Sequence, residues 1–304
     1  MNSLASNRLL PFLACAGGIM TFGAMDAVMK ALSLDIGTYN ALLWRCMIGA
    51  LMALLLFLLR PGRMPHGEAL RLHIIRASVT AVMAFTFFWG LARTPMAEAI
   101  AISFIAPLIA LYLAAVLLGE KISRYAIIAS LLGLAGVVVI VIGKLGEDFS
   151  SEAQLGIAAI LVSACLYAWN LILQRQQAQI ARPEEIALFQ NGIVTFWLAL
   201  FAPWFAVFPV QSVMPLIGLG ALLSIVSVLL LSWAYARAET QALVPIEYSM
   251  FLWAALFGWL FFNEPLSETV IIGTVLIVAG CLLATRNQPH EHESPETLDG
   301  QVSG

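Results

Sequence analysis

Residues 91–123 read LARTPMAEAIAISFIAPLIALYLAAVLLGEKIS, and residues 236–267 read ARAETQALVPIEYSMFLWAALFGWLFFNEPLS. Both belong to one longer repeat, because residues 89–140 align without a gap on residues 233–284 at a constant shift of 144. Matches between leucines or alanines carry little weight in so apolar a chain. The informative identities are Trp89/Trp233, Arg93/Arg237, Glu120/Glu264, Ser123/Ser267 and Gly136/Gly280. Each copy contains apolar runs long enough to cross a bilayer, and an internal repeat of membrane spans is typical of transporters.

The composition is that of an integral membrane protein. Of the 304 residues, 61% are hydrophobic and only 11% are charged, and the mean hydropathy is +0.92, whereas a soluble domain carries about 25% charged residues. The net charge of −3 gives no reason to expect a nucleic-acid partner. The four cysteines stand singly in apolar runs, so neither a metal site nor a cofactor is expected: Cys15, Cys46, Cys165 and Cys281.

The apolar runs predict an all-α integral membrane fold of ten transmembrane helices. A helix needs about 20 apolar residues to cross a bilayer, and ten such runs lie between short polar breaks. They are residues 10–32, 39–59, 73–92, 96–118, 125–142, 155–173, 186–207, 214–236, 241–262 and 269–283. Most intervening loops have only a few residues, so successive helices are expected to be antiparallel neighbours.

Basic residues predict the orientation. Most of the 15 Lys and Arg residues fall in segments that are cytoplasmic if the amino terminus is inside, whereas Arg93 and Lys144 fall in outer loops. The positive-inside rule therefore places both termini in the cytoplasm. Five spans per copy is an odd number, so the second copy enters the membrane with opposite polarity and the copies form an inverted repeat. The predicted units are a first five-helix repeat at 1–143, a linker at 144–154, an inverted second repeat at 155–286 and a disordered cytoplasmic tail at 287–304.

The repeat resembles the duplicated unit of the EamA-type family of the drug/metabolite transporter superfamily. The resemblance rests on the two stretches quoted above and on the small-residue segments that follow them, LLGLAGVVVI at 131–140 and VLIVAGCLLA at 275–284. It implies two inverted five-helix halves around a central cavity that opens alternately to each side. It also implies secondary transport of a small organic metabolite, amino-acid-, nucleotide- or vitamin-like, across the inner (cytoplasmic) membrane. The stretch FGAMDAVMK at 22–30 departs from the common pattern, which has a Trp-Gly pair, and is similar to branches proposed to carry S-adenosylmethionine or riboflavin.

Ionisable residues deep within the spans are the first candidates for function, because a charge at mid-bilayer costs about 2.5–3.5 kcal/mol on insertion scales. Asp26 and Lys30 lie four residues apart on one face of the first span, where they could form an ion pair. Two interpretations stay open for this pair. It either takes part in substrate binding or coupling, or it only orients the helices.

Arg45 lies six residues into the second span with no acidic residue within one turn. Its planar donor fork suits carboxylate or phosphate, so one interpretation is an anionic group of the substrate, and the other is an ion pair with Asp26 or Glu247. In the repeat alignment, Glu247 corresponds to Ser103 of the first copy. Because low-dielectric surroundings favour the protonated form of a carboxyl group, Glu247 could exchange a proton, and Tyr248 beside it offers a ring for stacking.

Three uncharged residues complete the candidate site. Pro107 lies in the middle of the fourth span and leaves the Ser103 carbonyl without its helical donor, so it is a candidate hinge, although a buried helix can also tolerate proline without mechanical consequence. Asn170 and Gln190 place amides on the sixth and seventh spans. They either line the cavity or form hydrogen bonds between helices.

The leading functional hypothesis is a secondary transporter, not an enzyme, whose inverted halves rock around a site formed by these residues. The chain has no Gly-x-x-x-x-Gly-Lys-Ser/Thr motif, which leaves proton coupling, exchange or facilitated passage. One alternative is a non-transporting membrane scaffold. Another is a membrane-embedded lipid-modifying enzyme, although no Cys/His ligand set or Gly-x-Ser-x-Gly motif supports it. The expected partners are a small-molecule substrate and membrane lipid, with the protein a monomer or homodimer.

Overall fold

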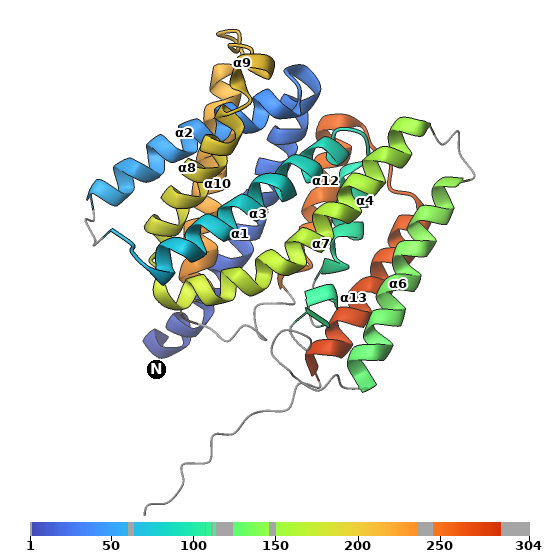
Figure 1. Cartoon of the computed structure of the whole chain (residues 1–304). Helices are drawn as coiled ribbons and strands as arrows, with labels where there is room; N and C mark the ends of the chain where they lie inside the picture. Colours follow the sequence, from blue (N-terminus) through green and yellow to red (C-terminus); the bar gives the residue numbers. More distant parts are fainter. Residues whose placement is uncertain are drawn as a thin grey trace, which may run out of the picture.

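The computed structural model describes residues 2–59, 64–106, 108–110, 112–113, 124–145, 150–235, 237 and 246–286. Within these ranges the chain is helical and contains no strand (Figure 1). The helices are α1 (Asn2–Asp35), α2 (Thr38–Leu59), α3 (Glu68–Leu91), α4 (Met96–Ser103), α6 (Arg124–Leu145), α7 (Ser151–Ile180), α8 (Pro183–Ala199), α9 (Ala202–Phe205), α10 (Met214–Tyr235), α12 (Met250–Phe262) and α13 (Glu268–Arg286). The predicted all-α fold is confirmed for this part of the chain.

Five helices are long and apolar enough to cross a membrane, at Leu10–Asp35, Thr38–Leu59, Glu68–Leu91, Ser151–Gln174 and Met214–Ala234. Shorter apolar helices occupy Met96–Ala110, Leu131–Ile140, Met250–Phe262 and Glu268–Gly280. Each of the ten ranges predicted from the sequence overlaps one of these helices or α8. The chain is therefore a multi-pass membrane protein.

The seventh predicted span is interrupted in the structure. It was expected over residues 186–207, but α8 ends at Ala199 and the single turn of α9 follows. The reason is Pro203, the second residue of α9, which has no amide hydrogen to donate to the Ala199 carbonyl.

The helix boundaries repeat with the offset of the sequence repeat. α3 ends at Leu91 and α10 ends at Tyr235, while α6 begins at Arg124 and α13 begins at Glu268. Both pairs are 144 residues apart, as are the aligned segments that begin at 89 and 233. The duplication is therefore visible in the helices as well as in the sequence.

The repeated tryptophan and arginine fold alike in the two copies. The Arg93 guanidinium lies 3.7 Å from the centroid of the Trp89 ring, and the Arg237 guanidinium lies 4.2 Å from that of Trp233. Each arginine also donates a hydrogen bond to the carbonyl of its tryptophan, at 3.0 Å and 3.2 Å. These cation–π pairs explain why both residue types are kept at this spacing in each copy.

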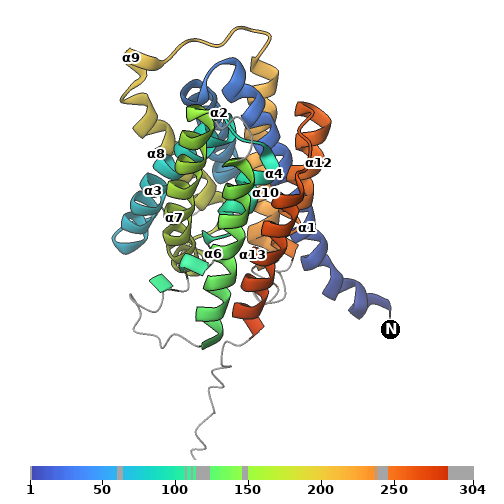
Figure 2. The ribbon, with the colours of Figure 1, turned by 90° about the vertical axis from the view of Figure 1, so that its right-hand side faces the viewer.

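The main contacts between the two copies are symmetric (Figures 1 and 2). α1 packs on α10, α3 on α7, α2 on α8, α4 on α12 and α6 on α13. By the repeat, the counterparts of α1, α2, α3, α4 and α6 are α7, α8, α10, α12 and α13. When each helix is replaced by its counterpart, the α1/α10 contact becomes the α7/α3 contact. The α2/α8, α4/α12 and α6/α13 contacts stay the same, as a duplicated fold requires.

The counterparts α6 and α13 are antiparallel and touch through small residues. A Cβ atom on Gly143, near the end of α6, would collide with Thr269 at the start of α13, and one on Gly136 would lie 2.5 Å from the Gly273 carbonyl oxygen. Small residues at such positions allow two helix backbones to meet in a membrane. Two copies of one helix therefore run in opposite directions here, side by side at the edge of the bundle (Figure 2).

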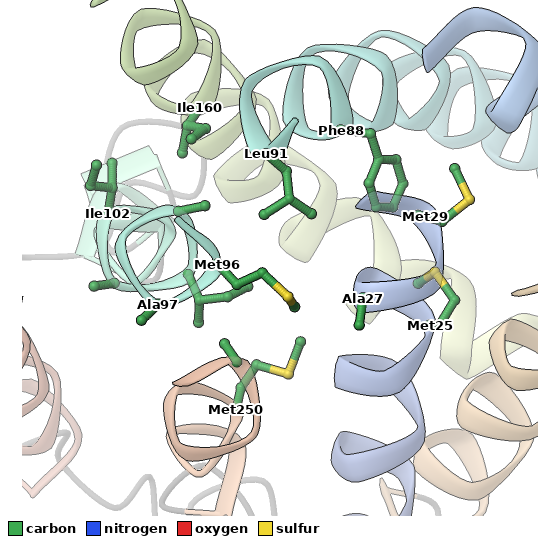
Figure 3. Close-up of a cluster of buried hydrophobic side chains, with 14 of the residues drawn as sticks. Met25, Ala27, Met29, Phe88, Leu91, Met96, Ala97, Ile102, Ile160 and Met250 are labelled. Atoms are coloured by element: carbon green, nitrogen blue, oxygen red, sulfur yellow. The ribbon is translucent and has the colours of Figure 1, made fainter. Parts of the chain in front are cut away.

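The core among α1, α3, α4 and α12 is rich in methionine (Figure 3). Met25 and Met29 of α1, Leu91 of α3, Met96 of α4 and Met250 of α12 are all 6% exposed or less. Methionine has three rotatable bonds and a polarisable sulfur, so it fills irregular gaps between helices. A core of this kind can repack when the helices around it shift.

Candidate functional site

A small polar cavity lies among α2, α3, α8 and α10, in the middle of these helices. The polar residues that line it are Arg45, Cys46, Thr80, Gln190, Asn191 and Ser224. It offers about 30 Å³ to the centres of water molecules, which is enough for two or three waters at the ~10–15 Å³ that one requires. Two residues predicted from the sequence, Arg45 and Gln190, therefore meet in one cavity.

Arg45 is held in this cavity by neutral groups. Its Nη1 donates to the Ser224 hydroxyl at 3.0 Å, and its Nη2 lies 3.2 Å from the Cys46 sulfur. Its Nε is buried and has no acceptor among the described residues, and no carboxylate in that set forms an ion pair with it. The alternative in which Arg45 pairs with Asp26 or Glu247 is therefore not the arrangement observed.

Asp26 is completely buried in α1, and both of its carboxylate oxygens lack a hydrogen-bond partner in the described part of the chain. The predicted ion pair between Asp26 and Lys30 is wrong. Lys30 instead pairs with Glu264, which follows α12. The physical reason is position along α1: Lys30 lies one turn closer to the end of the helix, where a carboxylate and a backbone carbonyl of other segments are within its reach.

The Lys30 cluster, as we call it, joins α1, the α3–α4 connection and the end of α12. Its members are Lys30, Thr94, Met96 and Glu264. Lys30 donates from Nζ to the Thr94 carbonyl oxygen at 2.6 Å and to Glu264 Oε1, while Glu264 Oε2 accepts the Met96 amide at 2.8 Å. The Lys30 and Glu264 side chains are 5% and 17% exposed. Charge-assisted bonds of this kind hold both halves of the repeat together at one end of the bundle.

The Arg76 cluster joins α3 to α7 and α8 at the other end of the bundle, near the start of α3. Its members are the buried residues His73, Arg76, Asn170, Gln177 and Glu185. Arg76 donates from Nε to Asn170 Oδ1 at 3.1 Å and from Nη1 to Gln177 Oε1. Asn170 therefore bonds helices to each other, which is one of the two roles expected for it.

The same cluster contains a chain of hydrogen bonds through His73. Its Nε2 lies 2.8 Å from Glu185 Oε1, and its Nδ1 lies 2.5 Å from the Gln177 side-chain nitrogen. The Thr80 hydroxyl, which lines the central cavity, lies 3.3 Å from Asn170 Oδ1. The cluster is thus continuous with the cavity that holds Arg45.

Glu247 and Tyr248 lie just before α12. The Tyr248 ring packs edge-on against Phe104, with centroids 5.3 Å apart. Neither residue lines the cavity beside Arg45. The candidate hinge Pro107 lies outside the described residues.

The model of the EamA-like transporter family matches the chain twice, at residues 9–142 and 154–286. The chain belongs to the EamA-like transporter family. The resemblance inferred from the sequence is thereby confirmed, and the two matches of this EamA-like protein contain every residue of the two polar clusters.

Named relatives of this EamA-like chain are transporters. A pseudopaline exporter of Pseudomonas aeruginosa is 26% identical over 95% of this chain and 99% of its own. A riboflavin transporter of Rhizobium johnstonii is 28% identical over 73% and 72% of the two chains, and an S-adenosylmethionine uptake transporter of Rickettsia bellii is 26% identical over 69% and 70%. A solved crystal structure with 22% identity covers 93% of this chain and 97% of its own at a TM-score of 0.62, which shows a shared fold.

Most members of the two clusters, among them Glu264, His73 and Arg76, had no role predicted from the sequence. The only signal for Glu264 was its identity with Glu120 in the repeat. His73 and Arg76 lie near the predicted edge of the third span, where polar residues commonly face water. Their partners on α7 and α8 lie about 100 residues away along the chain, at separations of 94 for Asn170 and 112 for Glu185, so no local pattern could reveal them.

Proposed function

We propose that this chain is a secondary transporter that carries a small organic metabolite across the inner (cytoplasmic) membrane by alternating access. The observation that carries the proposal is a small polar cavity between two buried polar clusters at opposite ends of the bundle. The Lys30 cluster lies where α1 and α3 end, and the Arg76 cluster lies where α3 begins. A central site with a polar gate at each end carries cargo without leakage if only one gate opens at a time.

The proposal includes ten transmembrane helices in two inverted five-helix halves, residues 1–143 and 155–286, joined by 144–154 and followed by a cytoplasmic tail at 287–304. The antiparallel contact of α6 with α13 and the symmetric contacts of the other helices support it. With both termini inside, as the positive-inside rule predicts, the Lys30 cluster is the outer gate and the Arg76 cluster is the inner gate. Inverted halves of this kind can exchange conformations, and each exchange closes one gate and opens the other.

The residues then take distinct roles. Arg45 and Gln190 bind the substrate in the cavity, while Lys30 and Asn170 belong to the gates. Asp26 and Glu247 bind a cationic group or exchange a proton, Tyr248 stacks on the substrate, and Pro107 serves as the hinge of the fourth span. The relatives that transport pseudopaline, riboflavin and S-adenosylmethionine support a small organic metabolite as cargo.

A disulfide across the outer gate tests this proposal. A Cβ atom on Gly258 would lie 3.5 Å from Met96 Cβ, which is within the about 3.5–4.5 Å that a disulfide requires. The double variant Met96→Cys/Gly258→Cys, with the four native cysteines replaced, is reconstituted in liposomes. Counterflow is then measured with L-amino acids, nucleosides, riboflavin and S-adenosylmethionine, before and after oxidation.

We expect at least one of these compounds to exchange through the reduced protein, oxidation to stop the exchange, and a reductant to restore it. Each single-cysteine variant serves as a control and should be insensitive to the oxidant. Exchange at an unchanged rate through the oxidised double variant would contradict alternating access. The absence of exchange for every compound would favour the scaffold hypothesis.

A further inference from the structure

Four side chains of the Arg76 cluster form a continuous chain of hydrogen bonds from a buried cation to a carboxylate. Arg76 donates from Nη1 to Gln177 Oε1, and the Gln177 side-chain nitrogen lies 2.5 Å from His73 Nδ1. On the other side of the imidazole ring, His73 Nε2 lies 2.8 Å from Glu185 Oε1. All four residues are 7% exposed or less, so a broken bond leaves a polar group without bulk water as a partner.

The chain has one direction, and this direction fixes the protonation of His73. A guanidinium can only donate hydrogen bonds, so Gln177 turns its oxygen towards Arg76 and its NH2 group towards His73. Because the NH2 group can only donate, His73 Nδ1 is an acceptor and carries no proton. The hydrogen of the neutral imidazole is then on Nε2, which donates it to Glu185. The arrangement observed therefore requires a neutral His73.

Proton uptake at His73 Nδ1 is incompatible with this arrangement. The added N–H would face the NH2 group of Gln177, so two donors would meet at 2.5 Å. Turning the Gln177 amide over would bring its NH2 group against Arg76 instead. The new charge would also lie one turn from the Arg76 guanidinium, because residues three apart on a helix are neighbours. Separation of α7 from α3 relieves both conflicts, since it parts the two donors and admits water between the charges.

His73 is held to α8 whether or not it is charged. Its ring stacks on Phe189 with centroids 4.7 Å apart, and its Nε2 donates to Glu185 in either protonation state. A charged ring would be attracted by Glu185 of α8 and repelled by Arg76 of α3. The bond to Gln177 is therefore the one that protonation breaks, and it is the bond that joins His73 to α7.

The helices around His73 bring few further ionisable groups to this end of the bundle. On α7, Tyr167 lies ten residues before Gln177, about 15 Å along the helix. The inner half of α2, residues 49–59, has no ionisable residue. The charged residues Lys30 of α1 and Glu98 of α4 lie near Glu264, at the outer end. The remaining described ionisable side chains near His73 are exposed or half-buried: His66, Glu68, Arg71, Arg182 and Glu184.

The counterpart of α3, α10, packs without such a chain. The two helices end 144 residues apart, so Ile217 and Gly220 of α10 occupy the positions of His73 and Arg76. Ile217 is fully buried, and Val28 of α1 lies 3.2 Å from the position of a Cβ atom on Gly220. Apolar and small residues are therefore sufficient for this helix contact, and packing does not explain the polar chain between α3 and α7.

We infer that this chain is a proton-operated latch on the inner gate, closed when His73 is neutral and released when His73 Nδ1 takes a proton from cytoplasmic water. The inference rests on the proposed transport function, whose inner gate is the Arg76 cluster, and adds its regulation. The proton returns to cytoplasmic water when the bond from Gln177 forms again. Because the released state holds one proton more, the ratio of released to closed protein rises by up to about ten-fold for each unit by which the pH falls. Histidine side chains change charge between about pH 5 and pH 8.

The test measures access to the α3–α7 contact and needs no cargo. Leu173 is 8% exposed and shares one face of α7 with Asn170 and Gln177, whereas Gln176 is exposed. Leu173→Cys and, separately, Gln176→Cys are made in the full-length chain with the four native cysteines replaced. A charged, water-soluble methanethiosulfonate is applied at pH 8 and at pH 6. The rate of modification of Leu173→Cys is divided by that of Gln176→Cys, which removes the effect of pH on the thiol chemistry.

We expect this rate ratio to be at least about ten-fold higher at pH 6 than at pH 8. His73→Gln offers an acceptor to Gln177 and a donor to Glu185 but takes no proton, so it should remove the dependence on pH. His66→Gln, at an exposed histidine of the same end, is the matched control and should keep the dependence. Gln177→Glu should reverse it, because a carboxylate accepts from Arg76 and from a protonated His73 and so holds the latch closed in acid.

Three results would overturn the inference: a rate ratio that is equal at pH 8 and pH 6, a dependence on pH that persists in His73→Gln, and a dependence of unchanged sign in Gln177→Glu. Counterflow together with a constant rate ratio would overturn the latch and leave the transporter proposal standing. A dependence that His73→Gln removes and Gln177→Glu reverses would support the latch even if no tested compound exchanged.

Discussion

Glu264→Gln should destabilise the protein by removing the charge that neutralises Lys30. The substitution preserves the shape of the side chain but leaves the Lys30 ammonium, 5% exposed, with the Thr94 carbonyl at 2.6 Å and the Phe262 ring at 5.1 Å as its remaining contacts. Breaking a buried ion pair from one side costs about 3–5 kcal/mol. Because the Glu264 side chain is 17% exposed and two contacts of Lys30 survive, we expect a cost below this range, about 2–3 kcal/mol.

Substituting Lys30 instead of Glu264 distinguishes the contribution of the ion pair from that of the other contacts of the two residues. Lys30→Met removes the buried cation, and the carboxylate of Glu264 keeps the Met96 amide at 2.8 Å, so we expect a smaller loss of about 1–2 kcal/mol. The double variant Lys30→Met/Glu264→Gln should be more stable than Glu264→Gln alone, because no unpaired charge remains. This non-additivity is the signature of a direct interaction.

The assay is the thermal unfolding of detergent-purified protein followed by tryptophan fluorescence. At roughly 2–4 °C per kcal/mol for a chain somewhat shorter than this one, Glu264→Gln should lower Tm by about 4–12 °C. The control is Glu268→Gln, an exposed glutamate in the first turn of α13, for which we expect a loss below about 1 kcal/mol. A Tm for Glu264→Gln equal to that of the control, or strictly additive effects in the double variant, would refute the reasoning.

Three further predictions concern helix contacts, the Arg76 cluster and cysteine exposure. Gly136→Ala should lower the free energy of unfolding by about 1–3 kcal/mol, because its Cβ atom would lie 2.5 Å from the Gly273 carbonyl oxygen. The control Gly192→Ala, whose Cβ atom would have no atom within 4 Å, should leave stability unchanged or raise it in the same melting assay. Arg76→Leu should lower stability by more than about 2 kcal/mol, because it removes the donor to the buried Gln177 Oε1 and the closer of the two donors to Asn170 Oδ1. A Tm as high as that of the exposed control Arg71→Leu would contradict this. In a Cys281→Ser background, N-ethylmaleimide, which enters lipid and detergent, should label Cys165 on the surface of the membrane-spanning helix α7 in the folded protein, and the buried Cys15 and Cys46 only after denaturation. Labelling of the folded protein that persists in Cys165→Ser would show that the two inner thiols are accessible.

The helices were predictable from the sequence because the signal for a membrane span is local. A run of about 20 apolar residues is sufficient for it, and each of the ten predicted ranges overlaps a described helix. The end of α8 was placed too late, since hydropathy does not register the missing amide of Pro203. The repeat was equally readable, because identities such as Trp89 and Trp233 survive at a fixed spacing.

The candidate site was only partly predictable. Burial of Asp26, Lys30 and Arg45 followed from their positions deep in apolar runs, and the structure buries all three. The partner of Lys30 did not follow, because spacing along a helix says which residues share a face but not what lies opposite. Glu264 lies 234 residues away from Lys30 along the chain, and only the packing of α12 against α1 brings it there.

The multi-pass helical membrane fold and its internal duplication can be read from the amino-acid sequence, because hydrophobicity and identity at a fixed offset are properties of short segments. The tertiary structure alone decided which charges are satisfied. It joined Lys30 to Glu264 and Arg76 to Asn170 and Gln177, and it left Asp26 without a partner among the described residues. The physical reason is that side-chain pairing depends on distances between helices, and those distances are set by packing of whole helices rather than by any one stretch of chain.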